Sequence, residues 1–170
     1  MDSFADVDGE EIADVIAETL APFSREGGEN PAAVVEDLRE MMQDKVGIIR
    51  SGNLLQEALN DLDNLEARAA ITSPGGSRIY NPGWHQALEL SAMIDVSRMC
   101  ALAALHREES RGGHTREDFP VPDYKHWGKV NSVISLSADG SMSIEHTSYP
   151  PIEDEFKALL DADDLHEEEG

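Results

Sequence analysis

Lysine and cysteine are both scarce in this 170-residue chain, and positive charge is in short supply overall. Four of its 13 basic residues are lysine, whereas 35 residues are acidic, which gives a formal net charge of −22. A chain this negative repels phosphate, which excludes nucleic acid as a partner. The single cysteine, Cys100, allows no internal disulfide. Because it falls in an apolar segment, we expect a buried packing thiol and a reducing compartment.

Long hydrophobic runs are also missing. The longest apolar segment, residues 87–105, is interrupted by Glu89, Asp95 and Arg98, so no stretch approaches the ~20 apolar residues of a membrane helix. The first six residues are acidic and lack the basic start of a secretory signal. We therefore expect neither direct membrane insertion nor a signal peptide. The sequence also contains no GxGxxG, P-loop or CxxC motif, so it offers no dinucleotide fingerprint.

The acidic residues are spread along the chain, and only residues 161–170 form an acidic tail. A dispersed acidic surface with few lysines suggests adaptation to high salt. Screening over ~3 Å near 1 M removes the self-repulsion that loosens such a protein in dilute buffer. An acidic protein from an ordinary habitat is the alternative. The length fits one domain, or one domain with an appendage, large enough to bury a core without disulfides or metals.

Helical periodicity dominates the first two thirds of the chain. Apolar residues recur at helical spacing within residues 10–20, 31–46 and 55–69, and the spacing in the third segment predicts nearly antiparallel neighbours. Two asparagine–proline pairs, at positions 30–31 and 81–82, are strong helix starts. The second pair precedes a fourth helix, residues 84–105. Because this helix is apolar on nearly every side, we expect it to be the enclosed, central member of a bundle.

The pattern changes after Trp127. Alternating apolar residues on both sides of Asp139-Gly140 predict a β-hairpin. The predicted fold is therefore mainly α: a three- to four-helix antiparallel bundle followed by a loop and a small C-terminal β-hairpin. The expected boundaries are 1–127 for the helical bundle with its hinge loop, 128–160 for the hairpin extension and 161–170 for the acidic tail.

A charged segment, residues 107–120, directly follows the fourth helix and is the most informative part of the chain. Two glycines allow a sharp turn, and arginines bind carboxylates or phosphates bidentately, so the segment indicates a rigid docking corner or a polar site. As a docking corner, Arg111 and Arg116 would hold a partner surface; in the alternative, the chain's own acids bind both. The candidate docking residues are Ser110, Arg111, Gly112, Gly113, His114 and Arg116.

Catalytic and metal-binding interpretations of the same segment have little support. Ser110, His114 and Asp118 could serve as nucleophile, base and orienting acid, but three residues of one short loop rarely converge in that way. A metal site would draw on side chains that show no HxH or HExxH spacing. These are His106, Glu109, His114 and Asp118. We expect His106 instead to lie near the end of the fourth helix, where positive charge is favourable.

Three stretches resemble the C-terminal region of the flavoprotein subunit of succinate dehydrogenase and fumarate reductase. They are VGIIR at 46–50, RIYNPGWHQALEL at 78–90 and, most specifically, REESRGGHTREDFP at 107–120. The resemblance covers residues 30–127, with the helical segments in the family's order. The family more often has alanine where this chain has Gly113, a small departure. The resemblance implies that the whole enzyme interconverts succinate and fumarate through FAD and passes electrons to an iron–sulfur subunit.

The family's FAD-binding domain, its flavin-attachment histidine and its dicarboxylate-handling residues have no counterpart in this sequence. No catalytic, cofactor-binding or metal-binding residue therefore carries over. We expect the helical domain alone, as a fragment, split gene product or expressed domain, with no cofactor of its own and no activity in isolation.

The resemblance also implies partners. Residues 110–116 would dock onto the flavin-binding domain of the same subunit, and the domain would contact the iron–sulfur subunit. The protein would be cytoplasmic and held at the cytoplasmic face of the membrane through the complex. The C-terminal domain of L-aspartate oxidase, from the same superfamily, and a free-standing acidic helical adaptor are the alternatives.

Overall fold

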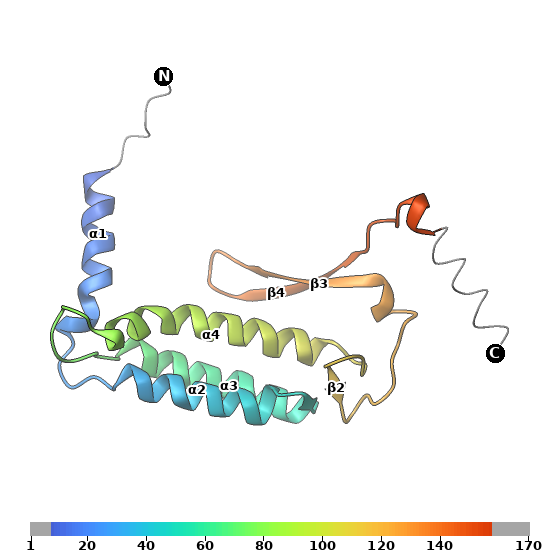
Figure 1. Cartoon of the computed structure of the whole chain (residues 1–170), viewed down its shortest axis with the longest axis horizontal. Helices are drawn as coiled ribbons and strands as arrows, with labels where there is room; N and C mark the ends of the chain where they lie inside the picture. The colour runs from blue at the N-terminus through green and yellow to red at the C-terminus, as the bar shows by residue number, and fades with distance from the viewer. Residues whose placement is uncertain (1–7, 158–170) are drawn as a thin grey trace, which may run out of the picture. The chain divides into compact units, whose positions relative to one another are not determined.

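A computed structural model describes residues 8–157, and the chain forms two compact units that divide between Pro122 and Asp123. The first unit is helical and the second contains a β-hairpin (Figure 1). The predicted fold class, a helical bundle followed by a loop and a small hairpin, is confirmed. The domain boundaries expected from the sequence stay a prediction, and the acidic tail at 161–170 lies outside the described residues.

Each α-helix of the first unit begins after a side chain that caps its N-terminus. Asp8, Asn30, Ser51 and Asn81 each accept a hydrogen bond from a backbone N–H of the first turn, and proline follows both asparagines. The two asparagine–proline pairs therefore mark helix starts, as the sequence predicts. The helices are α1 (Gly9–Leu20), α2 (Pro31–Val46), α3 (Gly52–Ala70) and α4 (Pro82–His106), with a short 3-10 turn, η1 (Ala21–Ser24), after α1.

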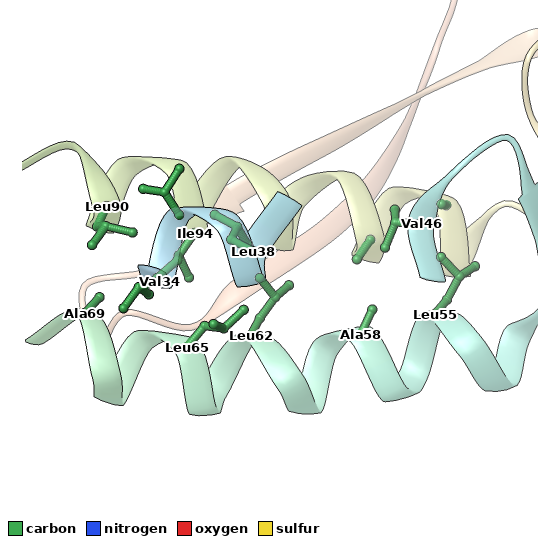
Figure 2. Close-up of a cluster of buried hydrophobic side chains, with 13 residues drawn as sticks. Val34, Leu38, Val46, Leu55, Ala58, Leu62, Leu65, Ala69, Leu90 and Ile94 are labelled. Carbon is green, nitrogen blue, oxygen red and sulfur yellow. The ribbon is translucent and has the colours of Figure 1, made fainter. Parts of the chain in front are cut away.

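The three helices α2, α3 and α4 pack together as a bundle (Figure 1). The end of α2, the start of α3 and the end of α4 meet at one end of it, so α3 runs antiparallel to both neighbours. Apolar side chains from all three helices point toward one another and form the core (Figure 2). Leu55, Leu62 and Leu90 are fully buried in it. Burying one such side chain stabilises the fold by ~1.5–3 kcal/mol.

Helix α4 is not enclosed within the first unit, which contradicts the expectation that it is the enclosed, central member of the bundle. Leu90 and Ile94 face the core, but Leu88 and Val96 are exposed. Cys100 is exposed as well, so the prediction of a buried thiol is wrong. The bundle supplies neighbours on one side of α4 only. Neither α4 nor any other helix within residues 8–157 has the length and apolar character needed to cross a bilayer.

Helix α1 precedes the bundle, and none of its side chains, all within the described residues, is buried. The indole N–H of Trp84, in the first turn of α4, donates to the Thr19 carbonyl near the end of α1 at 2.8 Å. The Trp84 ring also lies against Phe23, with ring centroids 5.6 Å apart. Trp84 thus joins the start of α4 to the segment that leads into the bundle.

Two short strands lie at the end of the bundle where α2 and α4 finish. β1 (Ile49–Arg50) pairs in parallel with β2 (Thr115–Arg116). The backbone N–H groups of Thr115 and Glu117 donate to the carbonyls of Ile48 and Arg50. This pairing holds the charged segment after α4 against the link between α2 and α3.

The second unit contains the predicted hairpin. After η2 (Trp127–Lys129), strand β3 (Val130–Leu136) pairs antiparallel with β4 (Met142–Ser148). Gly140 occupies the turn with φ at 83°, a left-handed conformation that glycine adopts without strain. Within this unit Trp127 is buried, and its ring lies 4.8 Å from that of His146.

Candidate functional site

The charged segment after α4 folds back and forms a cluster with the link between α2 and α3. We call it the arginine cluster. Its members are the charged and histidine side chains joined by hydrogen bonds and ion pairs at this end of the bundle: Arg50, Arg107, Glu109, Arg111, His114, Arg116 and Asp118. With four arginines against two carboxylates, the cluster is locally positive in a chain whose net charge is −22.

Arg116 lies at the centre of the arginine cluster and is 2% exposed. Its Nη1 donates to the carbonyls of Ala104 and Leu105 at 2.9 Å and to that of Arg107 at 3.2 Å. The last carbonyls of a helix have no partner within the helix, and the negative end of its dipole favours a cation. Arg116 therefore caps the C-terminus of α4 from inside the fold.

Asp118 completes the binding of Arg116 and connects it to α3. Its two carboxylate oxygens accept from Nε and Nη2 of Arg116, both at 2.7 Å, in a bidentate pair. Oδ2 also accepts from the backbone N–H of Gly52 at 3.0 Å, in the first turn of α3. The hydrogen bonds from Arg116 lower the pKa of Asp118 to about 2. One ion pair thus bridges the negative end of α4 and the positive end of α3.

Gly52 is required by this close approach. A Cβ at this position would lie 2.9 Å from Oδ2 of Asp118 and 3.3 Å from Nη2 of Arg116. Both contacts are tighter than ordinary van der Waals packing, so a larger residue would push the ion pair away from the start of α3.

Arg50 and His114 join the end of α2 to the same cluster. Nε of Arg50 donates to the carbonyls of Val46 and Gly47, at the end of α2, and Nη1 lies 2.6 Å from Nδ1 of His114. The other ring nitrogen of His114, Nε2, lies 3.1 Å from the Arg107 carbonyl. Since an arginine can only donate and a carbonyl can only accept, His114 is neutral with its proton on Nε2. Burial lowers the pKa of His114, which favours the same neutral form.

Glu109 is fully buried between two arginines. Nε of Arg107 donates to its Oε1 at 2.9 Å, and Nη2 of Arg111 lies 3.2 Å from the same oxygen. A buried carboxylate is tolerated when charged donors surround it. The alternative in which the chain's own acids bind both arginines therefore accounts for Arg116. It accounts for Arg111 only in part, because the Arg111 side chain keeps 27% of its surface exposed. The docking role of Ser110–Arg116 stays a prediction.

Ser110 and the two glycines shape the loop. The Ser110 hydroxyl accepts from the Arg116 N–H at 2.8 Å and lies 2.8 Å from the Phe119 carbonyl, to which it donates. Arg111 and His114 exchange two backbone hydrogen bonds across a tight turn in which Gly112 has φ at 60°. Gly113 has an ordinary φ and open space around its Cα, so alanine would fit there.

The structure does not assemble the serine–histidine–aspartate arrangement. Both ring nitrogens of His114 are engaged by Arg50 and a carbonyl, while Asp118 binds Arg116 and Gly52 instead of orienting the histidine. Over residues 8–157, no group of three or more histidine, cysteine or acidic side chains is arranged to hold a metal ion. His106 is the last residue of α4, as expected.

Arg50 was missed by the sequence analysis, and Glu109 was considered there only as a candidate metal ligand. Arg50 lies 64 positions from His114, and nothing local to it indicates that contact. Glu109 had a usable signal: alternation of Arg107, Glu109 and Arg111 in an extended segment places three side chains on one side. Arginines flanking an acid in that spacing indicate a buried carboxylate held between them.

The comparisons with known proteins show the family of this chain. The family described as Fumarate reductase flavoprotein C-term matches residues 35–158. A fumarate reductase flavoprotein subunit of Mycobacterium tuberculosis (strain ATCC 25618 / H37Rv) is 33% identical over 132 residues, covering 74% of this chain and 22% of the relative. A succinate dehydrogenase flavoprotein subunit of Coxiella burnetii (strain RSA 493 / Nine Mile phase I) is 35% identical over 104 residues, covering 59% of this chain and 17% of the relative.

A solved structure shows the same fold. The match with Mycobacterium smegmatis Sdh1 in complex with UQ1 has a TM-score of 0.82 and 34% identity. It covers 98% of this chain and 28% of the M. smegmatis chain. Fold and sequence together define a class, the C-terminal helical region of large flavoprotein subunits. The chain belongs to the fumarate reductase flavoprotein C-terminal family. It spans about a fifth of the length of the relatives that it matches.

Proposed function

We propose that this chain serves as the C-terminal structural domain of a flavoprotein that interconverts succinate and fumarate. In this proposal the remainder of the subunit holds FAD and the dicarboxylate, and electrons pass to an iron–sulfur subunit. The complex then sits at the cytoplasmic face of a membrane. Support comes from the family match and from relatives named as fumarate reductase and succinate dehydrogenase subunits.

The observation that carries the structural role is the use of Arg116, Asp118 and His114 to hold helix ends together inside the domain. Arg116 and Asp118 join the ends of α4 and α3, and His114 is held neutral between Arg50 and a carbonyl. Groups bound in this way hold helix ends together and are not available as a base or a nucleophile. The domain therefore acts by bracing the flavin-bearing part of the subunit.

Of the two arginines in the docking segment, Arg111 is the one placed to reach a partner, because Arg116 is 2% exposed. Arg111 shares the buried Glu109 with Arg107, while about a quarter of its side chain remains exposed, 27%. The buried carboxylate of Glu109 pairs with Nη2 of Arg111 and so fixes the direction of the guanidinium. Within the docking segment at 110–116, we therefore expect removal of the Arg111 side chain to weaken docking, while Arg107 still pairs with the buried Glu109 and limits the loss of stability.

The test is a fused subunit in which this chain replaces the matching C-terminal region of the M. tuberculosis relative. Retained flavin, a single cooperative melting transition and turnover of succinate or fumarate support the proposal. Arg111→Ala should lower flavin retention, while Arg39→Ala, at an exposed arginine on α2, should not. A fused subunit that retains no more flavin than the relative truncated before this region would refute the bracing role. Turnover of L-aspartate in place of succinate would favour the L-aspartate oxidase alternative.

A further inference from the structure

Helix α4 carries apolar residues around its whole circumference, but the bundle covers one side of it. The exposed positions Ala92, Val96 and Cys100 recur every four residues and so lie along one stripe, with Leu88 one turn earlier. Val96 keeps 58% of its surface exposed and Leu88 keeps 39%. We call this stripe the open face of α4.

The open face differs from the outer surfaces of the other two bundle helices. The exposed side of α2 carries Glu36, Glu40 and Asp44, which suits a surface in contact with water. From Leu90 to the end of α4 the chain has two charged residues before His106, namely Asp95 and Arg98. Arg98 is turned toward α3, where it pairs with Asp63 and Glu66. A surface so poor in charge is out of place on a chain of net charge −22, so we infer that something covers it.

A second observation concerns Arg50, which lies near the C-terminal end of α4. It is half-buried and within electrostatic range of Cys100. Its partners among the described residues are two backbone carbonyls and the His114 ring, and no carboxylate in that part of the chain pairs with it. Acids are abundant in this protein, so an arginine without one indicates that its carboxylate comes from elsewhere.

We propose that the open face of α4 packs against the flavin-bearing remainder of the subunit, which also supplies a carboxylate to Arg50. This inference rests on the proposed function and specifies which surface performs the bracing. The length of the relatives argues for this occupant. The match with the M. smegmatis structure spans 98% of this chain but only 28% of the M. smegmatis chain. Most of such a subunit therefore lies outside the region described here and is available to cover α4.

A second copy of this chain is a poor occupant. Two copies would bring a net charge of −22 each into contact, and mutual repulsion opposes such a dimer in dilute buffer.

Cys100 allows a direct test, because it is the single thiol of the chain and lies on the open face. Its rate of modification by a maleimide is measured by mass spectrometry of the Cys100 peptide, first in the isolated chain and then in the fused subunit. We expect labelling in the flavin-loaded fused subunit to be slower by about tenfold or more, since burial blocks access to the thiol. In the control variant Cys100→Ser/Glu40→Cys, the thiol moves to the polar side of α2 and both proteins should label at equal rates.

A second variant tests the surface without the thiol. Val96→Glu should leave the isolated chain folded, because the side chain is 58% exposed there, yet it should lower flavin retention by the fused subunit. If the fused subunit retains flavin while Cys100 labels at its free rate, the open face is not the interface, although the bracing function stands. Failure to retain flavin at all refutes the proposed function and this inference with it. Concentration-dependent protection of Cys100 in the isolated chain would instead identify a second copy as the occupant.

Discussion

Replacing Arg116 by alanine should be among the most damaging single changes in the first unit. The side chain is 2% exposed, binds three carbonyls at the end of α4 and pairs with both oxygens of Asp118. Its loss leaves those carbonyls uncapped and Asp118 without its counter-ion. Removing one partner of a fully buried ion pair costs ~3–5 kcal/mol, but the Asp118 side chain is 37% exposed, so water can replace part of what it loses. We therefore expect Arg116→Ala to lose ~2–4 kcal/mol, a large share of the ~5–15 kcal/mol that stabilises such a domain.

The assay is urea denaturation at fixed salt, followed by circular dichroism, with the free energy of unfolding taken from the midpoint and slope. Arg39→Ala is the matched control, because Arg39 is exposed and pairs only loosely with Glu36 at 3.7 Å. Its cost should stay within ~0.5 kcal/mol. Arg116→Lys keeps the charge but cannot bind Asp118 bidentately while capping α4, so it should recover only part of the loss. If Arg116→Ala costs no more than Arg39→Ala, the cluster does not hold the helix ends together.

Three further predictions concern pH, salt and flavin. Burial lowers the pKa of His114 below its ordinary 6.5, so the unfolded chain takes up the proton first as the pH falls. Stability should therefore decline from about pH 6.5 downward, and His114→Gln should reduce the difference in urea midpoint between about pH 7.5 and pH 5.5; an unchanged difference would assign it to other groups. With 35 acidic and 13 basic residues, the chain should melt at a clearly higher temperature in molar salt than in dilute buffer, and a flat or falling trend counts against salt adaptation. The purified chain should be colourless, because it contains no dinucleotide motif, and a stoichiometric flavin absorbance would contradict this.

The helices and the hairpin could be predicted because their signals are local. Asn30 and Asn81, each followed by proline, cap α2 and α4 through side-chain hydrogen bonds within the first turn. Asp139-Gly140 forms the hairpin turn, where glycine takes the left-handed conformation. Each depends on a few adjacent residues, so the sequence alone carries the information.

The exposure of α4 and the partners of the arginines could not be predicted in the same way. Whether Cys100 is covered depends on which helices lie beside α4, and the helix's own apolar pattern is nearly uniform around its axis. Several acidic residues lie near Arg116 in the sequence, so the sequence does not say which of them it binds. In the structure Arg116 binds one carboxylate and three carbonyls, because the fold of the backbone brings these groups beside it. Arg50 reaches His114 only because β1 and β2 pair.

The hydrogen bond between Gly52 and Asp118 joins positions 66 residues apart, and this separation has a consequence for folding kinetics. A contact of such long range forms only after α4 has docked on α2 and α3, because closing a long loop costs entropy before any contact compensates for it. We therefore expect the hydrogen bond from Gly52 to Asp118 to be absent from the rate-limiting step of folding and present in the native state. Its loss should accelerate unfolding far more than it slows folding. The cluster therefore contributes to how long the domain stays folded, and little to how fast it folds.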